Sequence, residues 1–339
     1  MKILRLLSIL LLVAMTLFVF AACNSNDSDD SDDSEEATGA TTTEATTAVE
    51  TTVEETTVET TEETTVVTTE ETSSSCSKDK MTYKIGVQIG ITGQYFVDGD
   101  ADWDFEGIKG YESKVYSNGG LAVNDMKNGN VDYVIIDEQS AKQLAKKIKG
   151  IKVIDIPLTV EEYALGVDKA QSELLTSVNT IIAEMKTNGT IDAIVAAYAT
   201  GEGIKPFTSA KFDASKADEQ LVVATNAAFA PFEYKEGEQF AGIDMEIAAY
   251  IAEKLGLELV IMDMDFDAVV TSVGKNGVDI AMAGLTVNET RKQSVNFTES
   301  YYNAAQMLVV KEGETSFDNC KTAEDVLAVL ASNVAPKAE

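Results

Sequence analysis

The sequence contains no histidine, and this absence narrows the possible chemistry. Histidine-based triads, histidine acid–base catalysis and most zinc sites are excluded. Basic residues are also scarce, because 26 lysines and arginines stand against 57 acidic residues, for a net charge of −31. So acidic a chain repels nucleic acid and anionic lipid. We therefore expect no nucleic-acid partner, no metal site and no cofactor.

Only the start of the chain contains a long apolar run. A basic beginning and an apolar stretch over 6–20 lead directly to Cys23, which follows two alanines. This pattern predicts a signal peptide over residues 1–22 and lipidation of Cys23, as in a bacterial lipoprotein. The alternatives are an ordinary signal peptide and an uncleaved anchor helix. The expected location is the extracytoplasmic face of the cell membrane, with the lipid as the only anchor.

The next segment is almost free of large apolar residues. Residues 24–75 contain sixteen acids and no base, and serine and threonine supply most of the rest. Such a tract cannot bury enough apolar surface to fold, so 23–75 is predicted to be a disordered tether behind the lipid. Two cysteines remain, Cys76 and Cys320, and in an exported protein they can form a disulfide; two free thiols are the alternative.

From residue 81 onward, short β-rich runs alternate with amphipathic helical stretches. This alternation predicts an α/β fold with parallel sheets covered by helices. Three Asn-Gly pairs resemble helix ends, and apolar runs follow them, which suggests two similar lobes with a shared cleft. The predicted strands are 83–89, 131–136, 153–156, 221–225, 257–262 and 278–283, and the clearest helices are 139–149, 170–187 and 243–255.

Arg291 is the single arginine after residue 23, in a chain that otherwise uses lysine. A guanidinium grips a carboxylate with two parallel hydrogen bonds. The run Thr286-Val287-Asn288-Glu289 has the pattern of a capping box, which predicts a helix beginning at Thr286 and an anion site at its end. A structural salt bridge is the alternative role for Arg291. For the ammonium of an amino acid, Asp137 is the candidate acceptor, and a solvated loop acid is its alternative.

Several motifs together resemble the family 3 solute-binding proteins, the polar amino-acid type of ABC-transporter binding lipoprotein. The resemblance covers most of 82–316. It rests on the runs 224–233, 242–244 and 283–286 with Arg291, on Phe297 and Tyr301-Tyr302, and on 84–93, 131–142 and 157–167.

The resemblance implies a two-lobed periplasmic-binding-protein-like type II fold and a set of ligand contacts. Arg291 would clamp the ligand carboxylate, and Asp137 would take its ammonium. Thr92 would also contact the carboxylate, while Thr286 and the backbone of Gly284 would bind near both charged groups. Phe229 would flank the ligand side chain, and Phe266 would help to line its pocket.

The family segments occur in a circularly permuted order. Closure within one chain and closure by swapping between chains are both open. Cys320 would lie just ahead of the strand near Tyr83, close to Cys76. The expected ranges are 1–22 for the signal peptide, 23–75 for the lipidated cysteine and tether, 76–160 for lobe 2, 161–216 for the C-terminal helices of lobe 1, 217–316 for the N-terminal part of lobe 1, and 317–339 for a tail toward lobe 2.

The implied function is capture of a free amino acid and its delivery to an ABC transporter permease, with no enzymatic activity and no catalytic residues. The alternatives are a degenerate or regulatory ligand-sensing relative and, less favoured, a dehydratase-type enzyme on the same fold. No additional acid demands a cationic ligand side chain, so a polar neutral or small amino acid is favoured. The acidic loop 94–110 carries the single tryptophan, Trp103. It could cover the cleft or contact a permease, but a solvated loop is the favoured role.

Overall fold

The computed structural model describes residues 83–334. The predictions for the signal peptide, the tether, Cys23 and Cys76 lie outside the described residues. Within the described range, no helix is both long and apolar enough to cross a membrane.

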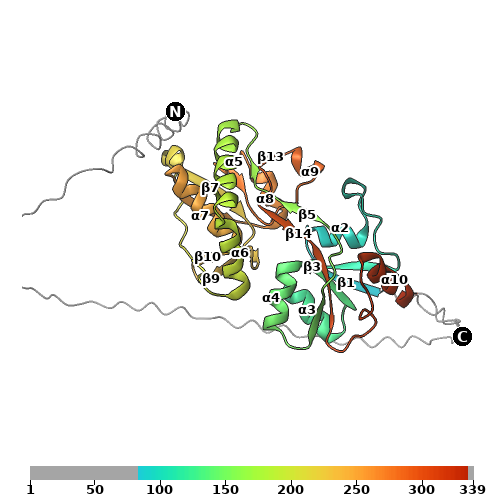
Figure 1. Ribbon diagram of the computed structural model, residues 1–339. Helices are drawn as coiled ribbons and strands as arrows, with labels where there is room; N and C mark the ends of the chain where they lie inside the picture. The colour runs from blue at the N-terminus through green and yellow to red at the C-terminus, as the bar shows by residue number, and fades with distance from the viewer. Residues whose placement is uncertain (1–82, 335–339) are drawn as a thin grey trace, which may run out of the picture. The chain divides into compact units, whose positions relative to one another are not determined.

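The first sheet forms the centre of lobe 2, around β1 and β3 in Figure 1, and its strand order is β2-β1-β3-β15-β4. Its strands are β1 (Tyr83–Gln88), β2 (Tyr111–Tyr116), β3 (Tyr133–Asp137), β4 (Ile151–Ile154) and β15 (Gln306–Lys311). β1, β2 and β3 are parallel, and β15 is antiparallel to both of its neighbours. Successive residues of β3 enter different apolar clusters, so both faces of the sheet are buried.

Four helices accompany this sheet: α2 (Thr92–Asp98), α3 (Gly119–Asn128), α4 (Glu138–Lys147) and α10 (Ala323–Val334). The side chain of Asn118 caps the start of α3, and Gly129 ends it in the left-handed conformation that glycine adopts without strain. The predicted Asn-Gly stop is therefore confirmed at this helix. At 275–277 it is wrong, because α8 (Phe266–Ser272) has already ended where Val273 becomes extended.

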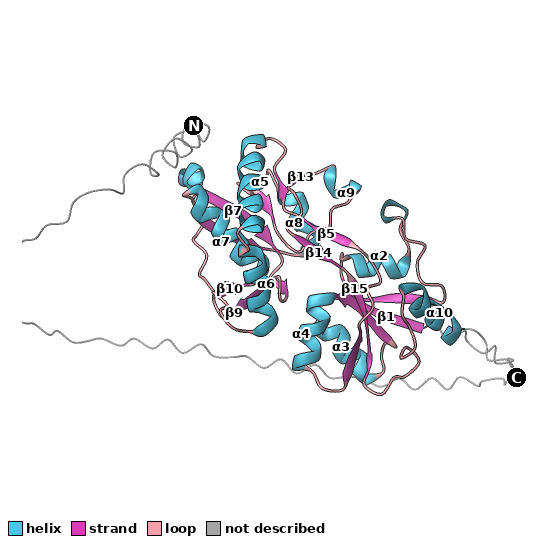
Figure 2. Ribbon diagram, viewed as in Figure 1, coloured by secondary structure: helices cyan, strands magenta, loops and turns pink. Residues whose placement is uncertain are grey.

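The second sheet, in lobe 1, repeats the same arrangement with the order β11-β7-β12-β6-β13. Its strands are β6 (Gly166–Val167), β7 (Gln220–Thr225), β11 (Glu258–Asp263), β12 (Ile280–Ala281) and β13 (Asn296–Phe297). Here β6 is the antiparallel strand. Helices α5 (Ser172–Thr187), α6 (Thr190–Thr200) and α7 (Ile243–Leu255) lie together beside this sheet (Figure 2). The predicted α/β two-lobed type II fold is confirmed.

Two short strands carry the chain between the sheets. β5 (Glu161–Tyr163) pairs antiparallel with β14 (Tyr302–Ala304). β6 follows β5 into lobe 1, and β15 follows β14 into lobe 2, so each sheet receives its antiparallel strand from a crossing segment. β15 lies inside the range 217–316 that the sequence assigns to lobe 1, but its sheet partners are β3 and β4 of lobe 2.

The last described helix lies beside the first described strands, as Figure 1 shows. Val326 and Leu330 of α10 share an apolar cluster with Ile85 of β1. The hydroxyl of Tyr111 in β2 donates to the carbonyl of Leu330 at 3.2 Å. Cys320, at the entry to this helix, is a partly buried thiol. The two ends of the described chain therefore pack in the same lobe.

Candidate functional site

The candidate residues occupy strand ends in both lobes and one crossing strand. Thr92 opens α2 shortly after β1, and Asp137 is the last residue of β3. Thr286 follows β12 in lobe 1 and forms a bridge with Tyr163 of β5. Ends of parallel strands that converge in this way are where open α/β folds bind ligands.

A buried acid that the sequence analysis missed connects the two lobes. The hydroxyls of Thr92 and Thr286 both donate to Oε2 of Glu161, at 2.5 and 2.7 Å, and lie 3.1 Å from each other. The other carboxylate oxygen accepts from Thr159 at 2.7 Å and from Gln306 at 3.1 Å. The two predicted threonine contacts are thus brought together, and in this state both hydroxyls are engaged by Glu161.

The helix predicted to begin at Thr286 begins three residues later. α9 covers Glu289–Lys292 only, and Asn288 is its N-cap, accepting from the backbone N–H of Arg291 at 2.7 Å. Asn288 takes this role because the hydroxyl of Thr286 is bonded to Glu161 instead. The predicted helix start is therefore wrong; a single turn has a small macrodipole, and the guanidinium of Arg291 is the main positive feature here.

Arg291 has no carboxylate partner among the ion pairs of residues 83–334. Its side chain donates to the carbonyl of Thr286 at 2.9 Å and to that of Gly90 at 3.3 Å. Its guanidinium carbon lies 5.4 Å from the ring centroids of both Phe266 and Trp103. Burial lowers the pKa of Arg291, and the structural salt bridge considered as its alternative role is absent from the described part.

The acidic loop is not merely solvated, which corrects the favoured reading of 94–110. Besides the contact of Trp103 with Arg291, Thr290 donates to the carboxylate of Asp102 at 3.1 Å. Both contacts join the loop to lobe 1. Trp103 could be suspected from the sequence as a lone indole in a polar loop, but its partner could not.

Asp137 is fully buried and is therefore not a solvated loop acid. Its carboxylate caps α4 by accepting from the backbone N–H of Ser140 at 3.0 Å, and it accepts from the hydroxyl of Tyr163 at 3.3 Å. Burial, reinforced by the charge of Glu161, raises the pKa of Asp137 to about 7. A second carboxyl, Glu233, is also buried and has a raised pKa, again mainly because of burial. Among residues 83–334, neither of its oxygens has a hydrogen-bond partner, and no ion pair involves Asp137 or Glu233.

Gly284 packs against the aromatic part of the site. Its φ is +53°, and a Cβ at this position would lie 2.8 Å from the ring of Phe229. Its N–H already donates to buried Asp244 at 2.9 Å, so of its backbone groups the carbonyl is the one left for a ligand. Phe229 in turn stacks on Phe232, which is fully buried, as expected for a core residue.

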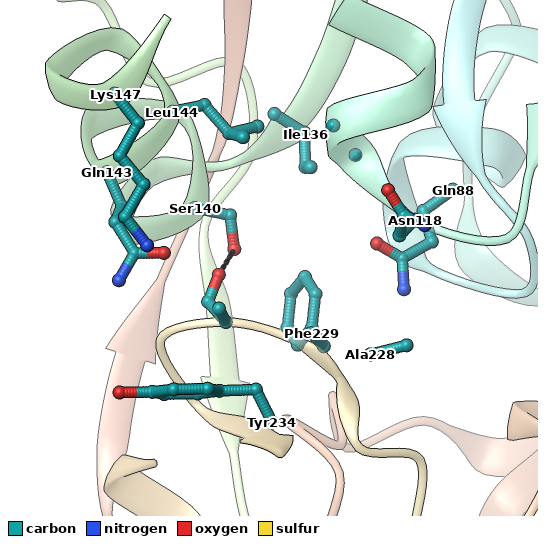
Figure 3. Close-up of a pocket in the computed structure, with 13 residues that line it drawn as sticks. Gln88, Asn118, Ile136, Ser140, Gln143, Leu144, Lys147, Ala228, Phe229 and Tyr234 are labelled. Carbon is teal, nitrogen blue, oxygen red and sulfur yellow. Dashed lines mark hydrogen bonds between the residues drawn. The ribbon is translucent and has the colours of Figure 1, made fainter. Parts of the chain in front are cut away.

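A cavity of about 290 Å³ lies beside Phe229, between residues of both lobes (Figure 3). Phe266 is not among its lining residues and lies beside Arg291 instead. Gln88, which the sequence analysis missed, lines the cavity, and its buried Oε1 has no hydrogen-bond partner in the described part of the chain. The full lining is Gln88, Asn118, Gly119, Gly120, Ile136, Ser140, Gln143, Leu144, Lys147, Ala228, Phe229, Ala230 and Tyr234.

Residues 221–335 match the family model described as bacterial extracellular solute-binding proteins, family 3. The chain belongs to this family through that segment. Among similar curated proteins, the arginine-binding extracellular protein ArtP of Bacillus subtilis is 40% identical over 27% of this chain and 36% of its own length. The L-arginine-binding protein of Pseudomonas aeruginosa is 30% identical over 30% of this chain and 40% of its own.

The chain thus spans about two fifths or less of the length of these two solute-binding relatives. Among solved structures, the arginine-bound form of domain 1 from TmArgBP is 30% identical, with a TM-score of 0.24, and the match covers 36% of this chain and 99% of that one.

Proposed function

We propose that the chain is an extracytoplasmic amino-acid-binding protein that delivers its ligand to an ABC transporter permease. The observation that carries this proposal concerns residues 83–334: there Arg291 forms no ion pair with an acid, and the buried Asp137 and Glu233 form none with a cation. Arg291 and Asp137 come from different lobes, and a zwitterion supplies the missing partner of each. A ligand bound by both would hold the lobes together.

The ligand carboxylate lies on Arg291 in this proposal, with the hydroxyls of Thr92 and Thr286 beside it. When ligand binds, those hydroxyls either exchange Glu161 for the ligand carboxylate as their acceptor or contact both. The ammonium lies on Asp137, and the carbonyl of Gly284 is a second acceptor for it. Phe229 forms one wall of the ligand side-chain pocket. Phe266, which contacts the guanidinium, supports the carboxylate end instead of the side-chain pocket.

The side-chain pocket is the cavity beside Phe229, and it favours a carboxamide. It has no acidic lining residue, and Lys147 is among those that line it. The Oε1 of Gln88 needs a donor, and Oδ1 of Asn118 is fixed by the backbone N–H of Leu121, which leaves the Asn118 amide as a donor. Figure 3 shows Gln88 and Asn118 on the same side of the cavity. A glutamine-like side chain satisfies both, whereas a guanidinium offers donors only.

Three further parts of the proposal concern the chain as a whole. A lipid on Cys23 and a flexible tether over 24–75 would hold the binding domain outside the membrane. The domain itself would be a circular permutant, which the repeated strand order and the packing of α10 beside β1 support. The dehydratase alternative is not favoured, because the proposal uses Asp137 to bind the ammonium.

A thermal-shift screen of the twenty amino acids, followed by calorimetry, tests the proposal. The ligand should stabilise the domain by about 2.7 kcal/mol at 100 times its dissociation constant. Arg291→Ala should reduce affinity by more than about 30-fold, since truncating one partner of a charge pair costs roughly 2–5 kcal/mol. Lys292→Ala is the matched control, because Lys292 pairs with exposed Glu289.

If no amino acid stabilises the protein, the function is wrong. If arginine, the ligand named for the relatives, binds best, the carboxamide assignment fails and the binding function stands.

A further inference from the structure

We propose that Trp103 is a positioning residue for ligand capture: its indole, carried by lobe 2, holds the guanidinium of Arg291 in lobe 1 ready for the ligand carboxylate. The inference rests on the proposed function and adds to it a residue outside the family motifs. It gives the acidic loop a defined role at the anchor of the site.

The indole of Trp103 is held in place by contacts within lobe 2, in addition to its contact with Arg291. The ring of Tyr95 stacks on Trp103 with centroids 5.1 Å apart and an interplanar angle of 13°, and the ring of Phe105 lies 6.1 Å away on a similar plane. The single turn at Ala101–Trp103 is capped by Asp100, which accepts from the N–H of Asp102 at 2.8 Å. Contacts within lobe 2 therefore set the orientation in which the Trp103 ring meets Arg291.

The guanidinium of Arg291 contacts aromatic rings from both lobes. Phe266 of lobe 1 and Trp103 of lobe 2 each lie 5.4 Å from its central carbon. Carbonyls of Thr286 and Gly90 take two of its N–H groups. Contact with ring faces stabilises the cation, and it leaves the remaining in-plane N–H donors available for a carboxylate.

An indole suits this position better than the acids around it. The loop has four acids near the tryptophan, Asp100, Asp102, Asp104 and Glu106, and none of them forms an ion pair with Arg291. An acid bonded to the guanidinium would compete with the ligand carboxylate, whereas an aromatic ring stabilises the charge without occupying the N–H donors. The bond from Thr290 to Asp102 fastens the loop to α9 instead.

Because Trp103 and Arg291 belong to different lobes, their contact also holds the two lobes together. Trp103 should consequently slow ligand release as well as orient the anchor. A surface cation–π contact is worth about 0.5–1 kcal/mol and a desolvated one about 2, which corresponds to roughly 2- to 30-fold in affinity.

The full-length protein offers a direct readout, since Trp103 is its single tryptophan. Titration with the amino acid found by the screen should change the intrinsic fluorescence at the concentrations that calorimetry gives for binding. Trp103→Ala should weaken binding by about 2- to 30-fold, mainly through faster dissociation, and Trp103→Phe should restore most of the loss. Phe212→Ala, which removes a half-exposed ring packed at Gly277, is the control and should bind like the parent.

A double-mutant cycle separates positioning from general support. If Trp103 acts through Arg291, Trp103→Ala should cost much less in an Arg291→Lys background than in the parent. Parent-like affinity and dissociation of Trp103→Ala, or equal cost in both backgrounds, would overturn the inference while leaving amino-acid binding intact. Failure of every amino acid to bind the parent would overturn the proposed function, and this inference with it.

Discussion

Binding of an amino acid should release a proton, because Asp137 has to ionise to hold an ammonium. Burial raises the pKa of this carboxyl to about 7. Without ligand the group is therefore mostly protonated at pH 6 and mostly ionised at pH 8. The ligand ammonium favours the charged form, so the complex holds Asp137 ionised at both pH values.

The size of the effect follows from that pKa. Ligand binding should release about 0.9 proton at pH 6, about 0.5 at pH 7 and about 0.1 at pH 8. Affinity should fall about 10-fold from pH 8 to pH 6 and about 100-fold by pH 5. Stability of the ligand-free protein should change in the opposite direction. The folded state binds this proton more tightly than the unfolded chain, so the contribution of Asp137 is lost as pH rises from about 4 through 7.

Calorimetry in buffers with different ionisation enthalpies measures the released proton directly. Other ionisable side chains lie near Asp137, namely Glu161, Tyr163, Glu233 and Tyr302. Asp137→Asn assigns the proton, because it should abolish the release at pH 6 while weakening binding. Asp125→Asn, at a partly buried ion pair with Lys114 in the same lobe, should leave the release unchanged. Buffer-independent heats at pH 6 in a parent protein that binds its ligand would refute the reasoning.

Three other substitutions have defined outcomes. Gly284→Ala puts a Cβ 2.8 Å from Phe229 at a φ of +53°, and it should lower the midpoint of thermal unfolding through a cost of about 1–3 kcal/mol. Glu161→Ala leaves the hydroxyls of Thr92 and Thr286 without their acceptor, and denaturant titration should show a loss of about 2 kcal/mol or more. Ser140→Ala removes a 2.8 Å bond to the carbonyl of Ala230 in the other lobe, and denaturant titration should show a loss of about 0.5–1.5 kcal/mol.

Local signals in the sequence were sufficient for most of the fold. Buried parallel strands such as β7 are continuous apolar runs, and α7 carries an apolar stripe and a glycine stop. Arg291 could be selected from composition, because arginine is nearly absent from the rest of the sequence. Asp137 could be selected because an acid directly follows an apolar strand, and strand ends are where such folds bind ligands.

Residues whose environment comes from distant segments were not predictable in the same way. Glu161 belongs to an acidic pair at the edge of a short strand, which reads as a solvated turn. It is buried because β5 pairs with the distant strand β14 and because threonines from both lobes meet there. The sequence analysis also misplaced the start of α9, because a contact with a distant segment determines it. Thr286 and Asn288 are both good caps, and only the competing bond to Glu161 decides between them.

The site depends on sheet order more than on the order of the chain. In one sheet Thr92 follows β1 and Asp137 ends β3, and in the other sheet Thr286 follows β12. Both sheets have the same order, and each takes its antiparallel strand from a crossing segment, so the strand ends meet wherever the chain begins. The described part begins at Tyr83 in β1 and ends at Val334 in α10, and the connection over 201–219 leads into β7. Neither these two ends nor the connection supplies a lining residue of the cavity. A break can therefore be moved between these two places without separating Arg291 from Asp137.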